Sequence, residues 1–124
     1  MSLILIVEDN PRNMKLVRDV LQVKGFRTLE ATNAEDGIVL AVELRPDLIL
    51  MDIQLPGMNG IAALGVLRGK PETERIPVIA VTASVMQSDR NLITGAGFDG
   101  YVGKPIDLME FLGAVNAMLA RGPR

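Results

Sequence analysis

The chain has 124 residues, of which 48% are hydrophobic and 23% charged, so we expect one ordered domain over residues 1–124 and exclude disorder. Its net charge of −2 argues against a protein that neutralises many nucleic-acid phosphates. The sequence contains no cysteine and no histidine, which excludes disulfide scaffolds, thiol catalysis, Cys/His zinc sites and histidine acid–base chemistry.

The N-terminal stretch MSLILIVED carries neither an export signal nor a membrane anchor. Its apolar run covers only residues 3–7, follows no basic residue and precedes two acids. A secretory signal needs a basic start and roughly 7–15 apolar residues, and a membrane helix needs about 20. We therefore expect a soluble, cytoplasmic protein with no membrane partner.

Short apolar runs rich in β-branched residues alternate along the chain with longer amphipathic stretches. The short runs predict buried strands at residues 3–7, 48–51 and 78–81, and weaker strands at 27–31 and 100–102. Asn10–Pro11, Asn33 and Ser84 are typical helix starts, and Gly25 is typical of a helix end. A further helix is expected around residues 61–67, and the last helix has an apolar stripe of Leu108, Leu112, Val115 and Leu119.

Five strands that alternate with five helices predict an α/β fold. In such a doubly wound domain a parallel sheet lies between two layers of helices, with right-handed crossovers. Ligands bind beyond the carboxyl ends of the strands. The residues that follow the predicted strands at this edge are Glu8, Asp9, Asp52, Thr82, Lys104 and Pro105.

If the first and third strands are neighbours, three carboxylates crowd together at this edge. Like charges so placed favour either protonation or a bound cation, and oxygen ligands of this kind suit Mg²⁺. Lys104 adds a positive charge that is expected to meet an anion or one of the carboxylates, and Thr82 adds a hydroxyl donor. Each residue alone has an ordinary structural interpretation, but their shared edge favours a Mg²⁺-assisted site that forms an aspartyl phosphate.

The sequence resembles the receiver domain of bacterial two-component response regulators, nearly from end to end. The matching segments are Val7–Asn10, Pro46–Gly60, Ile76–Ala83, Gly95–Gly97 and Tyr101–Pro105. Within the family the chain is most similar to the stand-alone regulators of the DivK type, which relay cell-polarity and division signals. The resemblance implies a flavodoxin-like (βα)5 three-layer sandwich with strand order 2-1-3-4-5.

The resemblance also implies a role for each site residue. Asp52 would be the phosphoacceptor, phosphorylated by a histidine kinase or a phosphotransfer protein. Asp9, Asp52 and the backbone carbonyl of Gln54 would hold Mg²⁺, with indirect help from Glu8. Lys104 would pair with the phosphoryl group, and the Lys104–Pro105 peptide bond would be cis.

Further positions would transmit or time the signal. Thr82 and Tyr101 would form the switch, because a phosphorylated acceptor attracts the hydroxyl and vacates space for the ring. Gln54 and Ser84 match positions that tune dephosphorylation. The chain departs from the common pattern at Asn59 and Gly103, which puts loop rigidity and switching behaviour in doubt.

The output is expected to be protein contact rather than promoter binding. The chain ends 20 residues after Lys104, which leaves room for one helix and no DNA-binding domain. The fourth helix, the last strand and the last helix would form the contact surface. We expect that the protein is not an enzyme, and that it assists only its own phosphorylation and dephosphorylation.

Four alternatives remain at this point. The chain could be the receiver module of a hybrid histidine kinase or longer phosphorelay protein. A flavin-binding protein of the same fold needs a Ser/Thr/Gly-rich phosphate loop where this chain has Glu8–Pro11, and would be coloured. An aspartyl hydrolase often has a second Asp where this chain has Gln54. The complete set of Asp9, Asp52, Thr82 and Lys104 disfavours a pseudo-receiver that only binds.

Overall fold

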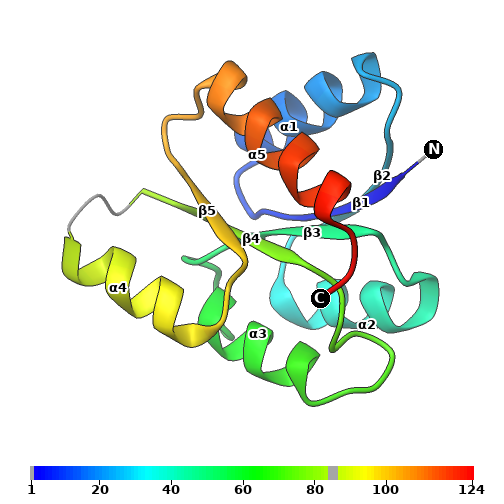
Figure 1. Ribbon diagram of the computed structural model, residues 1–124. Helices are drawn as coiled ribbons and strands as arrows, with labels where there is room; N and C mark the ends of the chain where they lie inside the picture. Colours follow the sequence, from blue (N-terminus) through cyan, green and yellow to red (C-terminus); the bar gives the residue numbers. More distant parts are fainter. Residues whose placement is uncertain (1, 84–86) are drawn as a thin grey trace.

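The computed structural model describes residues 2–83 and 87–124, in which five strands alternate with five helices (Figure 1). The strands are β1 (Leu3–Val7), β2 (Arg27–Ala31), β3 (Leu48–Asp52), β4 (Val78–Thr82) and β5 (Gly100–Gly103). The helices are α1 (Pro11–Val23), α2 (Ala34–Leu44), α3 (Gly60–Arg68), α4 (Gln87–Ala96) and α5 (Leu108–Arg121). None of these helices is both long and apolar enough to cross a membrane.

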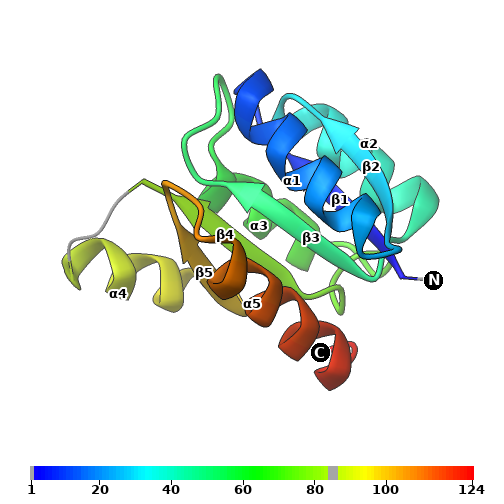
Figure 2. The same ribbon diagram turned by 90° about the horizontal axis from the view of Figure 1, so that it is seen from above.

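The strands form one parallel sheet in the order β2-β1-β3-β4-β5. Helices α1 and α5 cover one face of the sheet, and α2, α3 and α4 cover the other (Figures 1 and 2). This arrangement confirms the predicted doubly wound sandwich and its strand order. Strands β3, β4 and β5 each run one residue beyond the predicted ends, because the sheet pairing of Asp52 and Thr82 needs no apolar side chain.

Alternate residues of the central strands fill two halves of the core. On the α2–α3–α4 face the buried strand residues include Leu5, Val7, Ile49, Met51, Val78 and Ala80. On the α1–α5 face they include Ile4, Ile6, Leu48, Leu50, Ile79 and Val81. The two-residue period of a strand therefore accounts for the near-continuous apolar runs, since both faces of the sheet are covered.

The buried stripe of α5 differs from the predicted one. Phe111, Val115 and Met118 are buried, whereas Leu108 is 43% exposed. Val115 belongs to both stripes, and Leu112 and Leu119 of the predicted stripe are partly buried against the same core. The leucines satisfy the helical period equally well, but Phe111 and Met118 face the sheet and supply the larger buried side chains.

Side-chain caps begin four of the helices at or near the carboxyl edge of the sheet. Asn10 Oδ1 accepts from the backbone N–H groups of Arg12 at 2.9 Å and Asn13 at 3.2 Å, and Asn33 caps α2. These two caps confirm the predicted helix starts. Asn59 and Asp107 cap α3 and α5 in the same way. The predicted cap at Ser84 lies outside the described residues.

We predict that Gly60→Ala lowers the free energy of unfolding by about 1–3 kcal/mol, the usual cost of overpacking. A Cβ at Gly60 would meet the carbonyl oxygen of Asp52 and lie 2.9 Å from Ile53 Cα, and backbone atoms have little freedom to move away. Gly65→Ala in the same helix is the control, because its Cβ would meet nothing within 4 Å. Replacing this exposed helical glycine should stabilise the protein by about 0.5–1 kcal/mol. Urea unfolding of both variants checks the pair, and equal effects would contradict the close approach.

Candidate functional site

The adjacency of β1 and β3 brings three carboxylates together at the carboxyl edge of the sheet. Val7 pairs with Met51, so Glu8, Asp9 and Asp52 follow at nearly the same level. One oxygen from each of the three carboxylates lies within 4.8 Å of the other two. Glu8 and Asp52 are buried and Asp9 is exposed. The arrangement concentrates negative charge where oxygen ligands can hold a hard divalent cation.

Lys104 enters this group from the end of β5. Its Nζ lies 3.0 Å from Glu8 Oε1 and 3.1 Å from Asp52 Oδ2, so one ammonium pairs with two buried carboxylates. The backbone N–H of Lys104 donates to the carbonyl of Thr82 at 2.8 Å, and the Lys104–Pro105 peptide bond is cis. One positive charge faces three carboxylates, so the group keeps a surplus of negative charge.

The two buried carboxylates have further partners, and Asp9 does not. Glu8 Oε2 accepts from the backbone N–H of Asn10 at 3.1 Å. Asp52 Oδ1 accepts from the backbone N–H of Gln54 at 3.0 Å. Within the part of the chain that the structure describes, the Asp9 carboxylate makes no hydrogen bond or ion pair. Asp9 is therefore the carboxylate most available to a cation.

Burial and charge shift the pKa values of Glu8 and Lys104. Burial raises the pKa of the Glu8 carboxyl, and the proximity of Asp52 adds to this effect against the weaker opposing contacts with Asn10 and Lys104. Burial by itself would lower the pKa of the Lys104 ammonium. Its hydrogen bonds to Glu8 and Asp52 outweigh burial, and the net pKa of Lys104 is raised. Lys104 therefore remains a cation at neutral pH.

Thr82 and Tyr101 lie on the same face of neighbouring strands. Thr82 pairs with Gly103, and Ala80 pairs with Tyr101. The side chains of Thr82 and Tyr101 therefore both lie on the α2–α3–α4 side of the sheet, offset by two residues along the strands. Thr82 is 2% exposed and Tyr101 is 37% exposed. Of the two predicted tuning residues, Gln54 is exposed beside Asp52, and Ser84 lies outside the described residues.

The sequence interpretation missed two features that hold the site. It assigned Glu8 only an indirect part in metal binding. It expected Lys104 to meet an anion or one of the carboxylates, but it did not specify Glu8 or the pairing of one ammonium with two carboxylates. It also treated Asn59 as a departure that weakens the loop. In the structure Asn59 Oδ1 accepts from the backbone N–H of Ala62 at 2.8 Å and caps α3. The spacing of Asn59 before the apolar run of α3 was the available signal.

The sequence and the fold match known proteins. Residues 4–116 match the family model of the response regulator receiver domain. The chain belongs to this family. It is 43% identical over 116 residues to the polar-differentiation response regulator DivK of Brucella anthropi. The aligned region covers 94% of each chain. These comparisons confirm the predicted family and its DivK-like character, and receiver domains are signalling proteins.

Solved structures agree with this assignment. The receiver domain of a sensor histidine kinase from Pseudomonas aeruginosa is 32% identical with a TM-score of 0.89, covering 96% of this chain and 98% of that one. That crystal structure has a magnesium ion coordinated in its active-site cleft. The receiver domain of a histidine kinase from Syntrophus aciditrophicus is 30% identical with a TM-score of 0.88, covering 97% and 91% of the two chains.

We predict that Lys104→Met destabilises the metal-free protein in a pH-dependent way. At about pH 8 the loss should be about 1–3 kcal/mol, because two buried carboxylates lose their shared donor. Because the pKa of Glu8 is raised, Glu8 is protonated in the folded protein at a higher pH than in the unfolded chain. The stability that this proton contributes is therefore present at low pH and is lost as the pH rises. The deficit should therefore shrink towards about pH 5.

Urea unfolding across this pH range, in a chelating buffer, measures the deficit. Lys15→Met is the matched control, because Lys15 forms an exposed helical ion pair with Asp19. Its effect should be small and nearly independent of pH. A Lys104→Met deficit that grows as the pH falls would contradict the assignment of buried carboxylates at this edge.

Proposed function

We propose that Asp52 accepts a phosphoryl group from the phosphohistidine of a histidine kinase or phosphotransfer protein. The observation that carries this proposal is the buried Asp52 carboxylate at the sheet edge, paired with the Lys104 ammonium. An oxygen lone pair of Asp52 attacks phosphorus and forms the O–P bond. The N–P bond breaks, and its electron pair leaves with the imidazole of the donor. A carboxylate nucleophile and a fixed cation suit this displacement.

Lys104 stabilises the charge that arrives with the phosphoryl group. Its Nζ is 3.1 Å from Asp52 Oδ2, so a short movement takes the ammonium from the carboxylate to a phosphoryl oxygen on the same side chain. Glu8 keeps the ammonium in place through its own contact of 3.0 Å. The raised pKa of Lys104 supports this role, since the ammonium must keep its proton.

Mg²⁺ is the proposed cofactor, held by Asp9, Asp52 and the backbone carbonyl of Gln54. Three features support this ion: the surplus of negative charge, the purely oxygen donor set, and the Asp9 carboxylate, which has no hydrogen-bond or ion-pair partner among the described residues. When bound, Mg²⁺ would supply positive charge that offsets the negative charge of the carboxylates and of the phosphoryl group. Glu8 contributes indirectly, because its two oxygens already accept from Lys104 and Asn10.

Thr82 and Tyr101 are the proposed switch. A phosphoryl dianion on Asp52 attracts the Thr82 hydroxyl, and the ring of Tyr101 on the same face of the sheet turns towards the space that the hydroxyl leaves. Tyr101 is 37% exposed, so its ring would become more buried on turning inward. Gln54 and Ser84 would tune dephosphorylation by shaping the access of water to Asp52.

The proposed output surface is formed by α4, β5 and α5. Exposed apolar side chains on these elements support the docking of a partner protein: Leu92 at 60%, Leu108 at 43% and Met109 at 86% exposed. We propose a cytoplasmic, single-domain regulator over residues 1–124 that binds no nucleic acid or membrane and has no separate enzymatic activity. The DivK relatives favour a role in cell polarity or the cell cycle.

The alternative is a receiver module of a hybrid histidine kinase. Two solved relatives at 32% and 30% identity are receiver domains of histidine kinases, and they favour this possibility. The chemistry proposed for Asp52 is the same in both cases. The reading frame that surrounds residues 1–124 distinguishes them.

We predict that a small-molecule phosphodonor adds one phosphoryl group to the wild-type protein in Mg²⁺ and little without it. Asp52→Asn should take up none, because the amide is a poor nucleophile. Asp19→Asn, which changes an exposed carboxylate on α1, should behave as wild type. Intact-mass spectrometry measures the phosphoryl uptake of all three proteins. Uptake that persists in Asp52→Asn would contradict the assignment, as would a wild type that forms neither a phosphorylated species nor a beryllofluoride adduct.

Tyr101 offers a direct optical test of the switch. It is the sole tyrosine and the chain has no tryptophan, so intrinsic fluorescence reports this ring alone. We predict that Mg²⁺ and beryllofluoride, which mimics the phosphoryl group, change the emission of the wild type and protect the ring from an aqueous quencher. Thr82→Ala should still bind beryllofluoride but lose the protection.

Thr32→Ala is the control, because Thr32 is exposed after β2 at the same edge of the sheet. It should keep the wild-type response. Full protection of Tyr101 in Thr82→Ala would show that the ring moves independently of the Thr82 hydroxyl, and it would overturn the coupled switch.

A further inference from the structure

The first strand of the sheet order, β2, is an edge strand whose bonded side can be identified. Among the described residues it pairs with β1 alone (Figures 1 and 2). Arg27 N–H donates to the carbonyl of Ser2 at 3.0 Å, and the carbonyl of Ala31 accepts from Glu8 N–H at 3.0 Å. The first and last residues of β2 therefore direct their backbone groups towards β1.

Thr28 and Glu30 hold the backbone groups that point the other way. Neighbouring residues of a strand direct their N–H and C=O groups to opposite sides, so these two residues present theirs to the outside of the sheet. Edge strands are usually protected by lysine, proline or a bulge. Strand β2 has the sequence RTLEA and an unbroken register with β1, and thus has none of these. We call the N–H and C=O groups of Thr28 and Glu30 the open side of β2.

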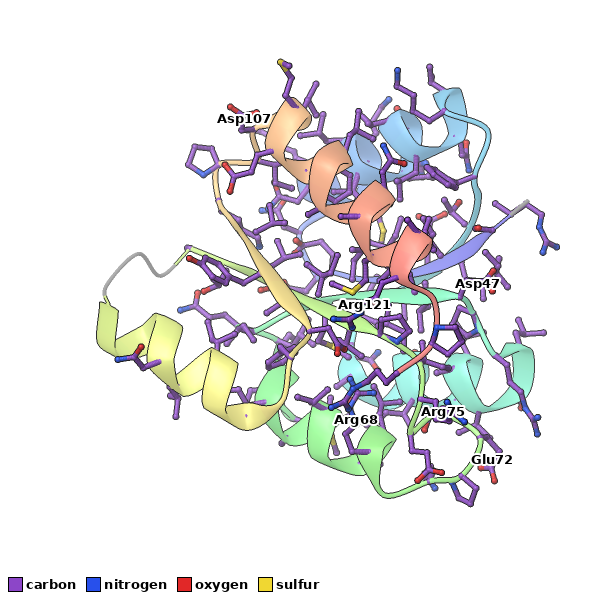
Figure 3. The ribbon with its side chains drawn as sticks, in the orientation of Figure 1. Asp47, Arg68, Glu72, Arg75, Asp107 and Arg121 are labelled. Atoms are coloured by element: carbon purple, nitrogen blue, oxygen red, sulfur yellow. The ribbon has the colours of Figure 1, made fainter. Side chains whose placement is uncertain are left out.

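The edge strand at the other end of the sheet, β5, is a poorer template for pairing. It is four residues long and begins and ends with glycine. The Asp99 carboxylate before it lies 2.9 Å from Arg68 Nη2 and 3.0 Å from Arg121 Nη2. Figure 3 shows these arginines reaching towards one another from α3 and α5, and α4 lies further out than β5 in Figures 1 and 2. An added strand is therefore expected at β2.

A hollow of about 360 Å³ lies next to the open side of β2, between this strand and α2. It is lined by the end of β2 and by one face of α2: Glu30, Ala31, Thr32, Asp36, Val39 and Leu40. Val39 is 52% exposed, and Asp36 is exposed as well. No basic residue belongs to this lining. The hollow therefore suits an apolar segment that carries a positive charge.

Strand β2 fits a second copy of itself in one antiparallel register. Outward backbone groups must meet outward groups, so the pair can be centred only on Thr28, Leu29 or Glu30. A centre at Glu30 would set two like charges directly opposite one another. A centre at Thr28 would need Phe26, whose N–H already donates to the carbonyl of Leu21 at 3.0 Å. A centre at Leu29 pairs Thr28 with Glu30 of the other copy twice, and each pair exchanges two hydrogen bonds.

The side chains match in this register too. The two copies of Leu29 meet on the α2 side of the sheet, where Leu29 is only partly buried against the core. Arg27 lies on the same side and opposite Ala31 of the other copy. Its positive charge then reaches the hollow that contains Asp36, and twofold symmetry repeats this contact.

We propose that β2 pairs with β2 of a second copy of this chain, antiparallel and centred on Leu29, so that the two sheets become one. Addition of a strand to an open sheet edge is a recurring mode of protein association, in which backbone hydrogen bonds supply affinity and side chains supply specificity. The pairing uses no group of the carboxylate site. It is therefore independent of phosphorylation at Asp52.

The oligomeric state of the full chain tests this pairing. Sedimentation velocity is measured from about 10 μM to 1 mM protein, in a chelating buffer without a phosphodonor. The contact is smaller than a standard interface, so we expect monomer at the lowest concentration and a dimer population at the highest. Amide hydrogen exchange at Thr28 and Glu30 should slow as the concentration rises, because these N–H groups become bonded. Asp52→Asn should behave as the wild type.

Glu30→Pro and Glu30→Ala form a matched pair of variants. Both remove the Glu30 side chain and its contact of 3.3 Å with Arg18. Only proline removes the outward N–H, and proline is tolerated on an edge strand where this group faces solvent. Glu30→Pro should weaken dimerisation at least about tenfold, because the symmetric pair loses a bond from each copy. Glu30→Ala should dimerise as the wild type.

The charge contact gives a second test that leaves the backbone intact. Arg27→Glu places like charges beside Asp36 of the other copy and should also weaken dimerisation about tenfold. Combining it with Asp36→Lys should restore part of the loss, because the two charges are then exchanged. Urea unfolding shows whether each variant is folded, so the proposal stays testable if Glu30→Pro is not.

Three outcomes would overturn the proposal. The first is a chain that stays monomeric up to about 1 mM, which would leave the open side of β2 to a strand of a different protein. The second is a dimer that Glu30→Pro and Arg27→Glu form as readily as the wild type, which would place the interface elsewhere. The third is a dimer in which amide exchange at Thr28 and Glu30 does not slow. None of these results would bear on phosphate uptake by Asp52.

Discussion

The ion pairs of one ammonium with two buried carboxylates are the interaction on which the site depends. Glu8 and Asp52 meet because β1 and β3 are neighbours, and at neutral pH two buried acids repel one another unless a cation separates them. Lys104 supplies that cation from the end of β5, two strands away from β3. Because three carboxylates still face one ammonium, the edge retains negative charge, which makes it receptive to a divalent cation beside Asp9.

The parallel topology gives the two edges of the sheet opposite chemistry. Helices start at the carboxyl edge, where side-chain caps such as Asn10 and Asn59 satisfy their first N–H groups. They end at the other edge, where Arg68 and Arg121 lie in the last turns of α3 and α5. A cation near a helix C-terminus is favourable, since the unpaired carbonyls carry partial negative charge. Only α3 and α5 follow this rule, since α1, α2 and α4 have no basic residue in their last turns.

Much of this architecture could be predicted from local patterns. The apolar runs at residues 3–7 and 48–51 identified buried strands because a strand covered on both faces needs apolar residues at every position. Asn10–Pro11 marked a helix start for an equally local reason. The apolar stripe of α5 was partly correct, because Val115 is buried and Leu112 and Leu119 pack partly buried against the core. It was wrong at Leu108, because only contact with the sheet selects Phe111 over Leu108. The strand-end pattern placed Glu8 and Lys104 at the same edge, but it could not specify that the Lys104 ammonium pairs with both Glu8 and Asp52, because that depends on side-chain distances set by packing.

By itself the sequence determined the fold class, the strand order through its family resemblance, and the gathering of Glu8, Asp9, Asp52, Thr82 and Lys104 at one edge. The fold class and the shared edge depend on periodicity and on the residue that follows each strand, whereas the strand order depends on the resemblance alone. Tertiary structure decided which carboxylate oxygens already have partners, which acid is open, and that the backbone groups of Thr28 and Glu30 face away from β1. Such contacts are set by distances between segments remote in sequence, and these distances exist only once the sheet and its helices have packed.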